Sequence, residues 1–222
     1  MRPDNDGDPV GIKAGLNSPL NISPQLHQLQ NGSCYYLDNS PEDYRLPHDS
    51  GIPVDYSEVL ALGVIHYYFP VSPDGKYVEV DAVMDERGYK YRDFVTLNKE
   101  TLGDALQSTL DGFYEEHMHE FEESRYILTG HGYWDIREHP TERWIRFKVG
   151  PGDLIILPPG MFHRFTLDEK SDLSSMRMFL HEPCRLAFPR GEEAEKSTYR
   201  VDYLKSVASN TPKFPAAIRK QQ

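Results

Sequence analysis

Two histidines separated by one residue, with a glutamate four positions later, could bind a metal ion. The segment EEHMHEFEESRYILTG, residues 115–130, supplies His117, His119 and Glu123 in this spacing. Side chains alternate across a β-strand, so His117 and His119 would project to one face, where Glu123 and Arg125 can continue after a turn. Neutral imidazoles and a carboxylate bind first-row divalent ions at about 2.0–2.2 Å. The alternative is a polar strand facing solvent, because nine histidines in 222 residues produce chance neighbours.

A third histidine lies behind a proline–glycine turn downstream. In GDLIILPPGMFH, residues 152–163, Pro158 and Gly160 favour a tight turn. The turn would deliver His163 onto the strand HRFTL, with Phe165 and Leu167 on its inward face. This second motif favours a metal site over a polar strand.

Together the two segments resemble the paired signatures of the cupin superfamily, G-x4-H-x-H-x3-E-x6-G and G-x5-P-x-G-x2-H. The resemblance implies a mainly β fold, a double-stranded β-helix or jelly-roll barrel, that holds one metal ion. The implied ligands are His117, His119, Glu123 and His163. The chain departs from the common pattern at Gly112, which is separated from His117 by four residues where five is usual, and at Leu167, where Asn is frequent.

Longer segments resemble the acireductone dioxygenases of methionine salvage, over roughly residues 34–190. The similar segments are YLDNSPEDYRLPH, LGVIHYYFP, KYRDFVTL, FYEEHMHEFEESRYILTGHGYWDIRE, RWIRFKVGPGDLIILPPGMFHRFTLDE and SSMRMFLHEP. By this resemblance Arg125 and Arg177 stand beside the substrate, and Phe165 belongs to the pocket wall. One departure is Cys184-Arg185, since many members carry Trp at the second of these positions; this puts the pocket shape and the specificity for the leaving end of the substrate in question.

The resemblance also implies a reaction and a cofactor. The metal is Fe²⁺ or Ni²⁺, one per chain, and the substrates are acireductone (1,2-dihydroxy-3-keto-5-methylthiopentene) and O2. The iron form gives formate and 4-methylthio-2-oxobutanoate, and the nickel form gives formate, carbon monoxide and methylthiopropionate. Two alternatives remain open: another enzyme with the same four ligands, and a non-catalytic, metal-binding cupin.

The two arginines have an independent interpretation from strand periodicity. Arg125 shares the parity of the histidine pair, and Arg177 shares a face with Phe179, so both would aim a cation at the interior. A buried cation is costly without an anion, and an anionic substrate would supply one. The alternative is that they pair with glutamates of the histidine segment. These are Glu115, Glu116, Glu120 and Glu122.

Composition limits the partners. The chain has 24 basic and 35 acidic residues and a formal charge of −11, which disfavours binding to nucleic acid or to anionic membranes. Cys34 and Cys184 form neither a disulfide framework nor a thiolate metal motif. We expect a monomer in the cytoplasm, with the nucleus as an alternative location.

The sequence predicts one domain with two tails. Residues 1–32 read as a flexible extension, 33–204 as a single cupin domain, and 205–222 as a loose tail. Helices are expected mostly before the histidine segment: a short one after Asp55, one over residues 76–89, and one behind Thr101 that ends at 111–112. Seven short strands are expected from residue 113 onward, separated by glycine and proline turns.

Overall fold

Two antiparallel sheets form the body of the protein. The computed structural model describes residues 34–38, 40–183 and 186–209; the expected N-terminal extension and Cys184-Arg185 lie outside them. In this part of the chain the strands are β1 (Cys34–Leu37), β2 (Asp49–Pro53), β3 (Ile65–Tyr68), β4 (Tyr91–Leu97), β5 (His117–Met118), β6 (Glu123–Gly130), β7 (Gly132–Arg137), β8 (Trp144–Val149), β9 (Asp153–Leu157), β10 (His163–Leu167), β11 (Leu173–Phe179) and β12 (Phe188–Pro189). The fold is mainly β, as the sequence predicted.

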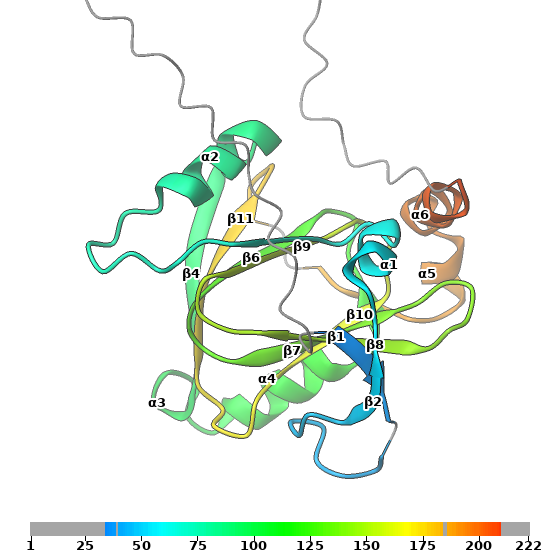
Figure 1. Ribbon diagram of the computed structural model, residues 1–222, viewed down its shortest axis with the longest axis horizontal. Helices are drawn as coiled ribbons and strands as arrows, with labels where there is room; N and C mark the ends of the chain where they lie inside the picture. Colours follow the sequence, from blue (N-terminus) through cyan, green and yellow to red (C-terminus); the bar gives the residue numbers. More distant parts are fainter. Residues whose placement is uncertain (1–33, 39, 184–185, 210–222) are drawn as a thin grey trace, which may run out of the picture.

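The strands are shared between a sheet in the order β12-β5-β10-β7-β8-β1-β2 and one in the order β3-β9-β6-β11-β4. The helices are α1 (Tyr56–Ala61), α2 (Val78–Arg87), α3 (Lys99–Leu102), α4 (Ala105–Tyr114), α5 (Glu192–Lys196) and α6 (Thr198–Ala208). In Figure 1, α2 lies near β4 and β11, while α5 and α6 lie at the opposite end of the molecule. None of the helices described is long and apolar enough to cross a membrane.

Strand alternation divides the apolar residues between two clusters. The first lies between the sheets and takes Ile155 of β9 together with Trp134 of β7 and Phe147 of β8. The second takes Leu154 and Ile156 from the other face of β9, and packs them against α2. Because one face of β9 meets the opposite sheet and the other meets a helix, the strand is a continuous apolar run rather than an alternating one.

The N-terminal helices agree with the sequence in part. Helix α1 begins at its expected cap, where the Asp55 carboxylate accepts a hydrogen bond from the Ser57 amide at 2.7 Å. Helix α2 confirms the helix expected over residues 76–89, and ends at Gly88, which has a φ of 73°. Before α1, residues Asp49–Pro53 form β2, which pairs with β1.

The helix expected behind Thr101 is wrong in its continuity. Two helices, α3 and α4, replace it, and the break falls at Gly103, where φ is 55°. Helix α4 also continues to Tyr114, so Phe113 and Tyr114 are helical rather than part of a strand. At the other end, α6 extends to Ala208, four residues beyond the domain boundary predicted at 204.

A buried ion cluster ties three strands of the first sheet together. Asp135 of β7 faces Arg146 of β8 and Arg164 of β10 in the strand register. Its carboxylate accepts hydrogen bonds from Arg146 Nε at 2.6 Å, Arg146 Nη2 at 2.9 Å and Arg164 Nε at 2.8 Å. Arg146 Nη1 also donates to the Leu46 carbonyl at 2.5 Å, which fixes the segment before β2. Asp135 and Arg146 are both fully buried.

This geometry predicts a large loss of stability for Asp135→Asn. The substitution leaves the Arg146 guanidinium buried without its counter-charge, so the free energy of unfolding should fall by about 3–5 kcal/mol. Urea denaturation would measure the change. The control is Asp202→Asn, which removes an exposed ion pair with Lys205 and should change stability little. Equal effects of the two substitutions would contradict a structural role for the cluster.

Candidate metal centre

Three segments bring the four expected metal ligands together. His117 in β5 lies directly opposite His163 in β10 in the register of the two strands. His119 follows β5, and Glu123 is the first residue of β6 in the other sheet. One ligand atom from each of the four side chains lies within 4.8 Å of all the others. The parity and turn arguments therefore predicted a real cluster.

Each histidine is oriented by a backbone carbonyl. His117 Nδ1 lies 2.6 Å from the Glu115 oxygen, and His163 Nδ1 lies 3.0 Å from the Met161 oxygen. His119 Nδ1 lies 2.7 Å from the oxygen of Leu186. A carbonyl only accepts hydrogen bonds, so each Nδ1 carries the proton and each neutral ring keeps its lone pair on Nε2. This is the arrangement that holds histidines as metal ligands through Nε2.

The Nε2 atoms converge on a carboxylate. Glu123 Oε2 lies 2.9 Å from His163 Nε2 and 3.1 Å from His119 Nε2. In these tautomers all three atoms present lone pairs to one another, so a cation is needed among them. Three imidazole nitrogens and one carboxylate oxygen form a donor set suited to a first-row divalent ion, and the residues present therefore fit a metal.

The surroundings keep the ligands in the forms that bind a metal. Burial lowers the pKa of His117 to about 4, with a further contribution from His163, so this imidazole is neutral at pH 7. Burial alone would raise the pKa of Glu123. The positive charge of Arg125 opposes this effect of burial and helps to hold that pKa well below its usual range.

The four side chains open onto a cavity of about 320 Å³. Its wall carries polar groups from Arg125, Arg177, Ser175 and Thr109, and aromatic rings from Phe113, Phe121, Trp134, Phe165 and Phe179. Val95, Leu97, Leu102, Leu173 and Ala187 are among its aliphatic lining. The cavity is thus lined by the four clustered residues, by two arginines and by a large apolar surface.

Both arginines point into this cavity, as predicted, and both have carboxylate partners in the protein. Arg177 Nε and Nη2 each donate to Asp93 of β4 at 2.6 Å, which gives a bidentate pair. Arg125, opposite Arg177 in the strand register, lies 3.3 Å from Glu123 through its Nη2. The glutamates suggested as alternatives are not the partners found in these pairs.

Two residues, which contact Arg177 and His119, were not predicted from the sequence. Asp93 could have been found from the parity of KYRDFVTL, since Val95 and Leu97 line the same cavity. Phe121 stacks on the ring of His119, with centroids 5.0 Å apart. Phe121 lies between β5 and β6, where no strand period applies, so nothing in the sequence indicated this contact.

The pocket wall includes Phe165, as expected. Its ring packs against Trp134 with centroids 4.3 Å apart, and against Phe113 of α4 at 6.4 Å. Trp134 packs in the core and also lines the cavity. Helix α4 therefore brings one edge of the aromatic wall to the site.

The remaining histidines lie outside the cluster. His131 and His139 are half-buried. His66 is buried, and its Nε2 lies 2.8 Å from Asp153. His181 lines a separate small cavity, together with Phe121.

A buried carboxylate anchors the strand start that carries Glu123. The neighbouring Glu122 is 4% exposed and turns to the opposite face. One of its oxygens accepts from Arg87 Nη2, and the other accepts from the Tyr89 hydroxyl at 2.6 Å. Because adjacent residues share a backbone, these bonds restrain Phe121 and Glu123 as well.

Comparisons with known proteins identify the family of the chain. The model of the ARD/ARD' family matches residues 33–187. The chain belongs to this family. Among curated relatives, acireductone dioxygenase 1 of Coprinopsis cinerea is 45% identical over 173 residues, which span 78% of this chain and 96% of the relative. Acireductone dioxygenase of Aspergillus fumigatus is 40% identical, over 80% of this chain and 97% of the relative.

A solved structure of a bacterial protein is also similar. It is described as acireductone dioxygenase from Bacillus anthracis with a cadmium ion in its active centre, and the match has 25% identity and a TM-score of 0.49, over 56% of this chain and 82% of that chain. Membership of the ARD/ARD' family, which lies within the cupin superfamily, makes the chain an enzyme of the dioxygenase class.

The site predicts that single ligand substitutions release the metal. Replacing His119 or His163 with Ala removes one of four donors, so elemental analysis should find most of the bound metal lost. The melting temperature should fall too, because an ion that binds only the folded state stabilises it. The matched control is His131→Ala, outside the cluster, which should retain the metal. Full occupancy in both ligand variants would refute the site.

Proposed function

We propose that the protein cleaves acireductone with O2, as an acireductone dioxygenase of methionine salvage. The supporting observation is the cluster of His117, His119, Glu123 and His163 at a cavity with two arginines on its wall. The curated relatives, which match this chain over nearly their whole length, carry the same activity in their names.

Both ends of the proposed substrate, the oxygen-bearing end and the methylthio end, match groups that line the cavity. A divalent ion in octahedral geometry with four protein ligands keeps two open positions, and when bound it would supply a Lewis acid for two neighbouring substrate oxygens. Arg125 and Arg177 stand near enough to face the negative charge of the enediolate. The salt bridge to Asp93 restrains the orientation of the Arg177 guanidinium. Less conformational entropy of this side chain is then lost when the substrate binds.

The apolar wall suits the methylthio end of the substrate. Phe113, Phe165 and Leu102 line the same cavity as the histidines, and they belong to α4, β10 and α3. Burying a thioether chain against these groups contributes favourable transfer energy of about 25 cal/mol per Å². The same wall limits access of water to the reacting carbons.

The proposed cofactor is Fe²⁺ or Ni²⁺, one per chain. Both ions accept imidazole and carboxylate ligands in octahedral geometry, so the donor set accommodates either. We propose that the ion determines the products: formate and 4-methylthio-2-oxobutanoate with iron, and formate, carbon monoxide and methylthiopropionate with nickel. We further propose that the enzyme acts in the cytoplasm.

The role proposed for Arg177 predicts a kinetic defect without loss of metal. A charge-assisted contact contributes ~1.5–3 kcal/mol, so Arg177→Ala should lower kcat/KM for acireductone by at least about tenfold. Metal content should stay unchanged, since Arg177 is not one of the four clustered residues. The control is Arg92→Ala, which removes a neighbouring pair with Asp81 at the surface. Unchanged kinetics in Arg177→Ala would leave Arg177 with a structural role only.

The proposed function itself is tested by exchanging the ion. Apoprotein reloaded with Fe²⁺ should consume O2 with acireductone and release formate without carbon monoxide, and the Ni²⁺ form should release carbon monoxide. Gas chromatography and NMR would identify the products, and metal-free protein serves as the control. Full metal loading with no O2 consumption in either form would favour a cupin with another substrate or without catalysis.

A further inference from the structure

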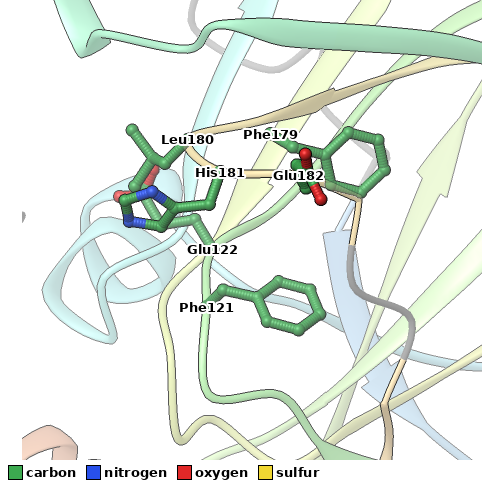
Figure 2. A pocket seen from close by; sticks show the side chains of 6 residues that line it. All are labelled: Phe121, Glu122, Phe179, Leu180, His181 and Glu182. Atoms are coloured by element: carbon green, nitrogen blue, oxygen red, sulfur yellow. The ribbon is translucent and has the colours of Figure 1, made fainter.

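A second, smaller cavity shares two aromatic side chains with the large one. Its volume is about 100 Å³. Among the described residues its lining is Phe121, Glu122, Phe179, Leu180, His181 and Glu182. Phe121 and Phe179 also line the cavity of the metal centre. Figure 2 shows the rings of Phe121 and Phe179 on the same side of this pocket, with His181 and Leu180 on the other.

The two shared rings stand next to the metal centre. Phe121 stacks on His119 at 20° between the ring planes. Phe179 ends β11 with the same parity as Arg177, whose guanidinium lies 5.8 Å from the Phe179 ring centroid. A molecule that moves from the small cavity between these rings therefore arrives beside His119 and Arg177. No other side chain is common to the linings described for the two cavities.

The lining favours a small, uncharged occupant. The Glu122 carboxylate is turned to Arg87 and Tyr89, so it is already satisfied. Phe121, Phe179 and Leu180 supply apolar surface, and the acidic groups of Glu122 and Glu182 would repel an anion. His181 and Glu182 are exposed, so the cavity opens to solvent on their side, while the two rings and Leu180 offer an apolar gas such as xenon a surface to bind. Dioxygen is smaller than xenon and equally uncharged.

We propose that this small cavity is a dioxygen site, from which O2 passes between Phe121 and Phe179 to the metal centre. This rests on the proposed function, in which an organic anion binds in the large cavity. The bound anion would obstruct the approach of O2 through that cavity. The small one offers O2 a separate approach to the same place.

The first test places a noble gas in the protein. Crystals of the metal-loaded enzyme pressurised with xenon should show a xenon atom between Phe121, Phe179 and Leu180. Leu180→Trp, which fills the small cavity from a residue that does not line the large one, should abolish the xenon peak. A small cavity without xenon in the unsubstituted enzyme overturns the proposal.

The second test measures the kinetics of O2. In Leu180→Trp, kcat/KM for O2 should fall at least about fivefold, while kcat/KM for acireductone at saturating O2 stays within about twofold. The matched control is Leu102→Phe, which narrows only the large cavity, and should weaken acireductone use first. An unchanged kcat/KM for O2 in a Leu180→Trp enzyme that has lost xenon binding overturns the route.

The outcomes of these tests distinguish failure of the dioxygen site from failure of the proposed function. Lack of turnover with acireductone would remove the assigned reaction, and it would leave xenon binding to decide whether the small cavity takes up apolar gas. Turnover without xenon binding would keep the reaction and remove the dioxygen site. Because crystal structures of Leu180→Trp show where the indole lies, misfolding of this variant is recognised directly; Leu180→Phe is then the variant for the kinetic test.

Discussion

The convergence of three imidazole lone pairs on one buried carboxylate constrains this fold more than any other contact described. Neutral histidines cannot donate to Glu123 through Nε2 while each Nδ1 donates to a carbonyl, so the arrangement is stable only around a cation. The strands must therefore place these groups to within a fraction of an ångström. The direct pairing of His117 with His163 across β5 and β10 fixes the positions of two of the four groups relative to each other.

Polar contacts on the outer faces of the two sheets restrain strands that carry the ligands. Glu123 belongs to the opposite sheet, so its position depends on how β6 is fixed. Glu122, bound by Arg87 and Tyr89, locks the beginning of that strand from its outer face. On the other sheet, Asp135 joins β7, β8 and β10 through two arginines. Polar contacts on the outer faces thus keep the inner faces rigid, which is what an oriented donor set needs.

The features of the fold and the site that could be predicted are those that depend on short-range patterns in the sequence. Strand parity indicated that His117, His119 and Arg125 lie on one side, although His119 lies just beyond the two-residue β5. Prediction failed where the chain leaves a regular element. The leucine repeat behind Thr101 did not reveal that Gly103 divides the helix, and Phe113 was assigned to a strand because aromatic residues favour strands. Phe121 lies in a turn, where no strand period applies. Parity places Asp93 on the inward face of its strand, but its pairing with Arg177 joins distant segments, which no local pattern encodes.

One hydrogen bond of the metal centre joins two segments that are far apart in the sequence. The carbonyl that orients His119 belongs to Leu186, and two residues later β12 pairs with β5, at Met118 and His117. The Arg190 amide continues this contact by donating to the Glu116 carbonyl at 2.9 Å, just before α5 and α6 begin. Binding of an ion and docking of the C-terminal helices would both favour this placement of His119, so each would strengthen the other, although the C-terminal segment supplies none of the four clustered donors.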